Sequence, residues 1–254
     1  MNNEQRIKTN KIAIDEDDVK LFFNNRVNKN LPYLINYTNY QDKHPELALE
    51  RDRYEKDRIM PFLNLQPESR VLDIGCGVGR WGNHMLKILS NQGMYVGADY
   101  SGDILKLAKN HFRENKNFYF CESYFQDILL NLPGNIKQNK FDVILINGVM
   151  MYINDADLAQ CMSNLKELIA VSGRICIKES VGLHDRLTLN KIYSEELESQ
   201  YSAIYRGVDE YNIMFRDAFS GDKYNIVYQD VMWQGDLANR KETTAYFWII
   251  EKIG

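Results

Sequence analysis

The sequence has no excess of basic charge, and this shortage bears on the partners that the protein can hold. Its 254 residues include 31 lysines and arginines against 35 aspartates and glutamates, which gives a net charge of −4 at pH 7. A nucleic acid bound by electrostatics alone requires a clear positive balance. No nucleic-acid partner is therefore predicted, although the net charge does not exclude a local basic patch.

Cysteine is also scarce. The four cysteines form no Cys-x-x-Cys pair, and their spacing fits neither a zinc site nor a disulfide framework. Two of them, Cys121 and Cys176, fall inside apolar, strand-like runs. We therefore expect reduced, buried thiols, no metal site and no metal or radical chemistry. The full set is Cys76, Cys121, Cys161 and Cys176.

Long apolar runs are missing as well. No run approaches the roughly 18 residues of a membrane span, and residues 1–10 lack the apolar core of a signal peptide. A soluble, cytoplasmic protein with no membrane partner is therefore expected. The apolar fraction of 44% is that of an ordinary globular chain, and the length suits one large α/β domain or at most two small ones.

From residue 70 onward, short apolar runs alternate with helical segments. This alternation predicts a parallel sheet with helices on both faces, and the continuous apolar run 141–146 is typical of a strand covered on both sides. Two C-terminal strands, 225–229 and 244–252, have no helix between them and should pair antiparallel. The other expected strands are 70–74, 94–98, 117–121 and 174–178, and the helices are 80–89, 102–111 and 158–170.

The N-terminal part is harder to assign. Residues 1–14 are expected to be loose, and the acids at 15–18 could cap a short helix that runs to about residue 27. Residues 28–45 give no clear pattern. Pro45 then opens a helix through Phe62.

The strongest motif is the segment from Val71 to Arg80, whose glycine-rich turn begins after Ile74. A strand ends before this turn and a helix begins near Gly79, so Gly75 and Gly77 let the backbone turn tightly and approach a ligand. Dinucleotide folds favour Gly-x-Gly-x-x-Gly, whereas the third glycine here comes one position earlier. A turn without a ligand is the alternative interpretation.

An acid ends the next strand. Asp99, followed by Tyr100, stands where a carboxylate can accept hydrogen bonds from both hydroxyls of a ribose. Such an acid suits a nicotinamide cofactor as well as S-adenosylmethionine. Asp73, two positions before the first glycine, is a second acidic candidate for cofactor binding.

The segment 72–79 resembles the first motif of class I S-adenosylmethionine-dependent methyltransferases, and Asp99 falls at the ribose-binding acid of that family. The likeness covers about residues 50–252. It implies S-adenosyl-L-methionine as cofactor and an α/β fold: a seven-stranded, mostly parallel, Rossmann-like sheet with an antiparallel last strand, helices on both faces and an N-terminal helical extension. Residues 1–45 would be this extension and substrate lid, and residues 46–254 the methyltransferase domain.

Further stretches are similar to the α-N-terminal protein methyltransferases and to small-molecule enzymes of the class. In that resemblance Arg80 pairs with the cofactor carboxylate through a bidentate fork; a solvated arginine in a first helical turn is the alternative. Phe125 and Gln126 would lie against the adenine. Asn147 takes the place of a glutamine that touches the cofactor.

The catalytic candidates lie where this sequence departs from the protein methyltransferases. Tyr152 stands where they have a histidine, and Glu179 replaces their aspartate, which weakens the case for the same peptide substrate. Tyr152 could hydrogen-bond the acceptor, take its proton or pack under the cofactor. Glu179 could be a base with a raised pKa or pair with Lys178 or Arg206. His184, beside an aspartate, could be a general base or lie in a surface loop.

The predicted reaction is methyl transfer to an oxygen or nitrogen of a small polar metabolite, such as a sugar or a biosynthetic intermediate. A base is needed only if the acceptor arrives protonated. The alternatives are a methyltransferase of a protein or peptide amine, a non-catalytic module that binds S-adenosylmethionine, and a dehydrogenase. The oligomeric state stays open. Aromatic segments 33–40 and 201–211 are expected to form the substrate lid with Tyr33, Tyr37, Tyr40, Tyr205 and Tyr211.

Overall fold

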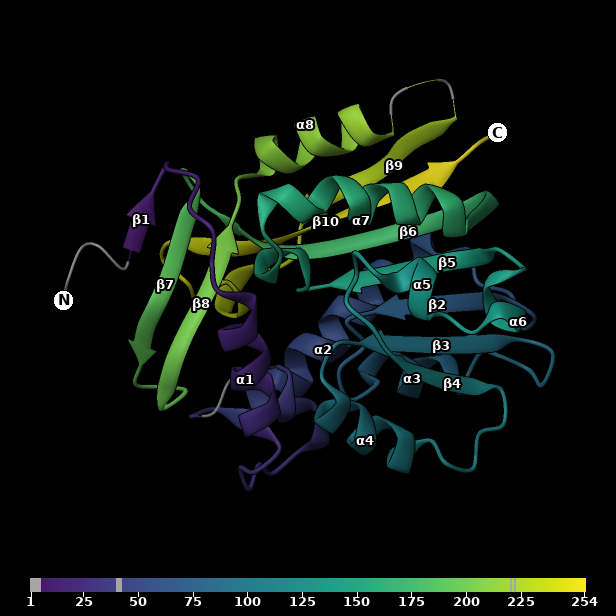
Figure 1. Ribbon diagram of the computed structural model, residues 1–254, viewed down its shortest axis with the longest axis horizontal. Helices are drawn as coiled ribbons and strands as arrows, with labels where there is room; N and C mark the ends of the chain where they lie inside the picture. Colours follow the sequence, from purple (N-terminus) through teal and green to yellow (C-terminus); the bar gives the residue numbers. More distant parts are fainter. Residues whose placement is uncertain (1–5, 40–42, 220, 222) are drawn as a thin grey trace.

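The computed structural model describes residues 6–39, 43–219, 221 and 223–254, and a seven-stranded sheet forms its centre (Figure 1). The strands are β2 (Arg70–Ile74), β3 (Met94–Asp99), β4 (Phe118–Glu122), β5 (Phe141–Asn147), β6 (Ile169–Gly182), β9 (Tyr224–Val231) and β10 (Thr243–Lys252). Their order is β4-β3-β2-β5-β6-β10-β9. The first five pair in parallel, and β10 is antiparallel to both β6 and β9. The predicted sheet is confirmed.

Helices cover both faces of this sheet, as predicted. Strand β5 shows why: Ile144 and Ile146 belong to one apolar core, while Val143 and Leu145 belong to the core on the opposite face. The first core is completed by α5 (Ile128–Asn131), α6 (Gly134–Lys137), α7 (Asp155–Leu168) and α8 (Val208–Ala218), and the second by α2 (Pro45–Ile59), η3 (Met60–Phe62) and α3 (Arg80–Met85). Helix α4 (Gly102–His111) follows β3. None of the helices described is long and apolar enough to cross a membrane.

Some boundaries differ from those predicted. Helix α3 ends at Met85 rather than at residue 89, because the next amides bond both three and four residues back: Ile88 N–H and Leu89 N–H both donate to the carbonyl of Met85. Strand β6 is much longer than the predicted 174–178, since antiparallel pairing with β10 extends over most of its length.

A second, three-stranded antiparallel sheet was not predicted. It consists of β1 (Arg6–Lys8), β7 (Leu187–Ser194) and β8 (Ser199–Tyr205), with β7 in the middle. The prediction that residues 1–14 are loose is therefore wrong for β1, because that segment gains backbone partners from a strand almost two hundred residues away. Local sequence pattern carries no information on such pairing.

The predicted N-terminal helix is present as α1 (Glu16–Arg26). Asp15 caps it by accepting hydrogen bonds from the backbone N–H groups of Asp17 and Asp18. Its apolar side packs against β8 in a third core that includes Phe22 and Tyr201. A 3-10 helix, η2 (Leu34–Tyr37), follows. In Figure 1, α1 crosses beside the ends of the central strands, between the two sheets.

Candidate active site

A cavity lies at the carboxyl ends of β2, β3 and β5, the usual ligand position in an open parallel sheet. The space between atoms there is about 860 Å³ when its open mouth is included. Of the nine residues predicted to bind the cofactor, eight line this cavity and Asp73 does not. The eight are Gly75, Gly77, Arg80, Asp99, Tyr100, Phe125, Gln126 and Asn147.

The glycine-rich turn forms one wall. Gly75 and Gly77 both have positive φ angles, +68° and +54°, in the left-handed region that disfavours side chains. A Cβ atom on Gly75 would lie 2.2 Å from a methyl carbon of Val149, and one on Gly77 would lie 2.6 Å from the methyl carbon of Thr38. Glycine is therefore required at both positions by the backbone and by its neighbours.

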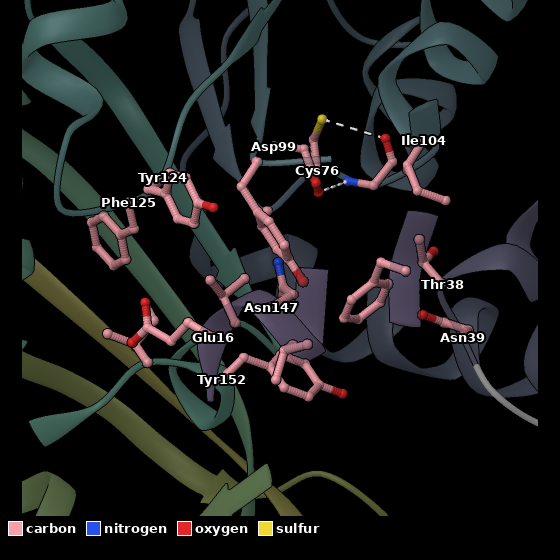
Figure 2. Close-up of a pocket in the computed structure, with 18 of the residues that line it drawn as sticks. Glu16, Thr38, Asn39, Cys76, Asp99, Ile104, Tyr124, Phe125, Asn147 and Tyr152 are labelled. Atoms are coloured by element: carbon pink, nitrogen blue, oxygen red, sulfur yellow. Dashed lines mark hydrogen bonds between the residues drawn. The ribbon is translucent and has the colours of Figure 1, made fainter. Parts of the chain in front are cut away.

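Asp99 connects this turn to the end of β3. Its Oδ2 accepts a hydrogen bond from Gly77 N–H at 2.9 Å (Figure 2). Its Oδ1 accepts one from Ser101 N–H at 2.9 Å. Burial raises the pKa of Asp99 to about 6, against the lowering effect of these two donors. Each carboxylate oxygen can accept more than one hydrogen bond, so the side chain can still receive hydroxyl donors from the cavity that it lines.

Asp73 has a different position. Its side chain is buried behind the turn, and its Oδ2 accepts a hydrogen bond from the hydroxyl of Tyr95 at 2.6 Å. Burial raises its pKa to about 7. A direct contact between Asp73 and a ligand in the cavity is therefore not supported by its placement; the residue supports the strand from which the turn begins.

Asn147 and Tyr100 bring buried polar atoms to the cavity wall. Both side-chain polar atoms of Asn147, and the hydroxyl of Tyr100, are buried and have no hydrogen-bond partner among the described residues. Both side chains line the cavity, and Figure 2 shows Asn147 near its middle. Buried polar groups usually have partners, so unsatisfied ones in a cavity wall indicate a ligand or ordered water.

The segment after β4 supplies an aromatic corner. Phe125 is buried beside Gln126 and Tyr124 in the cavity wall. The side-chain amide of Asn164, on α7, donates to the carbonyl oxygens of Phe125 and Gln126 at 3.0 and 2.8 Å and so fixes this segment. The rings of Tyr100 and Tyr124 stack at a centroid distance of 5.5 Å. These residues offer flat apolar surfaces to a ligand.

Tyr152 is the one predicted catalytic residue that lines the cavity. Its hydroxyl is 2.9 Å from the hydroxyl of Tyr201, which also accepts a hydrogen bond from the Tyr205 hydroxyl at 3.2 Å. The ring of Phe23 meets the Tyr152 ring edge-on at 5.4 Å. The predicted roles for Tyr152 as an aromatic wall and as a hydrogen-bonding group are thus compatible with one placement.

Glu179 is fully buried and points to the backbone rather than to the cavity. Its Oε1 accepts hydrogen bonds from Val149 N–H at 2.8 Å and Met150 N–H at 2.9 Å, and its Oε2 accepts one from Met151 N–H at 3.3 Å. Burial raises its pKa to about 7, against the lowering effect of these donors. The alternative ion pair with Lys178 or Arg206 does not form within the described structure.

Arg206 holds the same loop from its carbonyl side, a role that the sequence did not reveal. Its guanidinium donates to the carbonyl oxygens of Met150 and Ile153, each at 2.7 Å, and to Asp155. Together with Glu179, it fixes the short helix η4 (Met150–Tyr152) and with it the Tyr152 side chain. We call Glu179 and Arg206, with their hydrogen bonds to this loop, the loop clamp.

The remaining candidates lie elsewhere. His184 is exposed in the turn between β6 and β7 and does not line the cavity. Tyr211 was predicted to belong to the lid, which is wrong, because its side chain is buried against Trp248 in the main core. Tyr33, Tyr37 and Tyr205 are absent from the cavity lining described, and Tyr40 lies outside the described residues.

The N-terminal segment forms a further part of the cavity wall, which we call the roof. It consists of Glu16, Val19 and Phe23 of α1 together with Thr38 and Asn39. The side chain of Asn154, just after η4, connects the roof to the loop that the clamp holds. Its Oδ1 accepts a hydrogen bond from Ile14 N–H at 2.9 Å, and its amide donates to Ile14 O and to Glu16.

A family model described as a methyltransferase domain matches residues 65–236, more than half of the chain. The chain belongs to this methyltransferase family. The match confirms the prediction of a methyltransferase. Solved structures that share the fold contain S-adenosylhomocysteine, which agrees with the resemblance to class I S-adenosylmethionine-dependent methyltransferases.

Curated relatives of the methyltransferase are similar over about half of its length. A phosphoethanolamine N-methyltransferase from Triticum aestivum is 24% identical over 135 residues, which cover 52% of this chain and 25% of that protein. A demethylmenaquinone methyltransferase from Staphylococcus saprophyticus is 25% identical over 135 residues, 53% of this chain and 54% of that protein. The chain thus spans about a quarter to a half of the length of these relatives.

Solved structures share the fold. Phosphoethanolamine N-methyltransferase 1 from Haemonchus contortus, in complex with phosphoethanolamine and S-adenosylhomocysteine, has a TM-score of 0.69 at 16% identity and covers 94% of this chain and 49% of that one. An S-adenosylmethionine-dependent methyltransferase from Leishmania major has a TM-score of 0.64 at 16% identity, with 92% and 82% covered. The closer similarity to α-N-terminal protein methyltransferases stays a prediction.

The cavity of the methyltransferase fits its cofactor on two observations. The glycine turn leaves a cradle that side chains would fill, and Asn147 offers an unsatisfied donor and acceptor. Asn147→Ala is expected to weaken S-adenosylhomocysteine binding roughly two- to tenfold without lowering the stability of the free protein, because it removes buried groups that have no protein partner. Titration calorimetry and thermal unfolding measure the two effects; equal affinity in both proteins would contradict the assignment.

Proposed function

We propose that this methyltransferase transfers a methyl group from S-adenosylmethionine to an oxygen or nitrogen of a small polar metabolite. The observation that carries the proposal is the roof of the cavity: Glu16, Val19 and Phe23 of α1 line it, and the ring of Phe23 packs against that of Tyr152. A roof of packed side chains suits a small acceptor better than a residue of a folded protein or nucleic acid.

The proposed division of labour follows from the geometry. S-adenosylmethionine, when bound, supplies a methyl group on a positively charged sulfur that is already a good leaving group. Asp99 would accept the ribose hydroxyls, Arg80 would face the carboxylate, and Asn147 would use its two unsatisfied polar groups. The chain then has mainly to hold the acceptor in line and to exclude water, which alone can account for large rate effects.

Tyr152 is proposed to orient the acceptor. Its hydroxyl lies in the cavity wall and is held by Tyr201. Glu179, in contrast, is proposed to act as a positioning residue through the loop clamp rather than as a base, because its oxygens face three backbone N–H groups. His184 has no place in this scheme, since it is exposed outside the cavity.

Two measurements test the proposal. Titration with S-adenosylmethionine and, separately, with NADH should show binding of the first alone, which also separates a methyltransferase from a dehydrogenase. Formation of S-adenosylhomocysteine should then be followed with a panel of small amines, sugars and phenols and with short peptides. Turnover of peptides alone would favour a protein acceptor, and binding without turnover of any acceptor would favour a non-catalytic module.

Tyr152→Phe is expected to lower kcat with the best acceptor roughly two- to tenfold, the effect of one neutral hydrogen bond, and to leave S-adenosylhomocysteine affinity unchanged. Steady-state kinetics and calorimetry give the two numbers. Tyr193→Phe, which alters an exposed tyrosine on β7, is the matched control and should have no effect. A Tyr152→Phe enzyme with normal kcat and KM would remove the residue from acceptor orientation.

A further inference from the structure

A cluster of charged side chains lies where α2 packs beside the cavity; Glu55, Lys56 and Arg80 are buried, and the other two are half-buried. It contains Asp52, Glu55 and Lys56 of α2, Arg80 at the start of α3 and Lys178 on β6. We call these five residues the buried charge network. Charged side chains are seldom buried unless they are paired, so their arrangement calls for an explanation.

The network is a continuous chain of ion pairs. Arg80 Nη1 lies 2.8 Å from Asp52 Oδ1, and Arg80 Nη2 lies 2.5 Å from Glu55 Oε1. The second oxygen of Asp52 is 2.5 Å from Lys56 Nζ, and the second oxygen of Glu55 is 3.1 Å from Lys178 Nζ. Each acid therefore bridges Arg80 to a lysine.

The electrostatics of Glu55 favour its ionised form. Glu55 is only 1% exposed, and its burial opposes ionisation, but the charges of Arg80 and Lys178 overcome this and lower its pKa to about 2. The pKa of Arg80 is raised, because Glu55 and Asp52 outweigh the effect of burial. Counted by formal charge, the three cations of the network exceed its two anions by one.

One member of the network reaches the cavity. Arg80 is in the lining, whereas Asp52, Glu55, Lys56 and Lys178 are not among the lining residues described. The excess positive charge is thus presented to a ligand through a single guanidinium. The two acids use two of the five N–H donors that an arginine carries, which leaves donors for a further acceptor. A ligand group with a single negative charge would complete the balance.

We infer that Glu55 and Asp52 are positioning residues that fix Arg80 to receive the carboxylate of S-adenosylmethionine, so that α2 is part of the cofactor site. The inference rests on the proposed function. S-adenosylmethionine has one anionic group, its carboxylate, beside an ammonium and a sulfonium, so the carboxylate is the group that can pair with Arg80. Helix α2 (Pro45–Ile59) precedes the region 65–236 that matches the family model, so this contribution belongs to the chain's own N-terminal part.

Fixing the guanidinium has a physical purpose. A free arginine side chain loses rotamer entropy when it binds a carboxylate, whereas one already held by two acids loses less. The same acids compete with the ligand for positive charge, and the two lysines offset that competition by sharing the acids. Removing one acid should therefore lower carboxylate affinity, although it raises the net positive charge.

The test compares S-adenosylmethionine with decarboxylated S-adenosylmethionine, which differs from it by the carboxylate alone. Both are titrated calorimetrically into wild type, Glu55→Gln and Asp52→Asn. Wild type is expected to prefer the carboxylated ligand by at least about tenfold, within the range for hydrogen bonds to charged groups. Each variant should lose most of this preference and bind the decarboxylated ligand as wild type does.

The binding of the decarboxylated ligand also serves as a control for folding. Asp57→Asn, which alters an exposed acid on the same helix, should retain the full preference. If Glu55→Gln does not fold, Asp52→Asn carries the test, because the Asp52 side chain is more exposed, at 18% against 2%.

Three outcomes would overturn the inference. Both variants could keep the wild-type preference, they could bind the carboxylated ligand more tightly, or wild type could bind the two ligands equally. None of these contradicts the proposed function, which fails instead if wild type binds neither ligand. The measurement does not depend on turnover or on the identity of the acceptor.

Discussion

Glu179→Gln is expected to lower kcat about a hundredfold while S-adenosylhomocysteine affinity stays within a few-fold of wild type. The carboxylate accepts hydrogen bonds from the backbone N–H groups of Val149, Met150 and Met151. A glutamine offers one oxygen and turns its amide toward a donor, so the loop that carries Tyr152 must shift. A displacement of about 1 Å at a reacting group can cost about a hundredfold in rate.

Amide hydrogen exchange distinguishes positioning from direct chemistry. If Glu179 acts through the loop clamp, exchange of the amides of residues 149–151 should be faster in Glu179→Gln. Loss of turnover with unchanged exchange would show that the carboxylate takes part in the reaction itself. Glu167→Gln, which alters an exposed acid at the end of α7, is the control and should change neither quantity.

The pH dependence of stability gives an independent measurement on Glu179. Its pKa is raised from 4.5 to about 7. Between pH 4.5 and about 7, Glu179 is therefore protonated in the folded state and ionised in the unfolded state. The stabilisation that this proton provides is complete below pH 4.5 and is lost as pH rises through about 7. It amounts to roughly 3 kcal/mol by linkage. Glu179→Gln should lack this part of the decline; parallel stability curves would contradict the raised pKa.

The central sheet could be predicted because its signals are local. The apolar run 141–146 indicates a strand that is buried on both faces. The glycines after Ile74 indicate a turn whose backbone has positive φ angles. Asp99 could be placed at the same edge of the sheet, since parallel neighbours β2 and β3 end together. These inferences required no knowledge of distant contacts.

The buried charge network could not be predicted in this way. Asp52, Glu55 and Lys56 look like the solvated face of an amphipathic helix, and their burial depends on Arg80 and Lys178, which lie far along the sequence. Helix α2 buries Glu55 and Lys56 as well as Ile59, and periodicity finds only the apolar residue of the three.

The orientation of Glu179 was missed for a related reason. The sequence shows an acid after an apolar strand, but its partners are backbone N–H groups, which every non-proline residue carries. The tyrosines of the expected lid were similarly ambiguous. Tyr211 packs against Trp248 in the core, while Phe23 of α1 reaches the cavity. An aromatic side chain alone does not reveal whether it faces a ligand or a neighbour.

Asp99→Ala is expected to weaken S-adenosylhomocysteine binding by about 1.5–3 kcal/mol, the range for hydrogen bonds to charged groups. The carboxylate lines the cavity at the end of β3, where it can accept from ribose hydroxyls. Calorimetric titration measures the loss. Asp103→Ala, which removes an exposed acid from the first turn of α4, is the control and should bind as wild type does.

Asp99 also supports the glycine turn, because it accepts hydrogen bonds from Gly77 N–H and Ser101 N–H. Asp99→Ala can therefore weaken ligand binding by displacing this turn as well as by removing the ribose contact. A ligand that lacks the ribose 2′-hydroxyl separates the two contributions. Wild type should bind it more weakly than S-adenosylhomocysteine, whereas Asp99→Ala should bind both ligands alike, since the group that reads the hydroxyl is gone. If the variant keeps the wild-type difference between the two ligands, Asp99 acts through the turn alone, and another residue must bind the ribose.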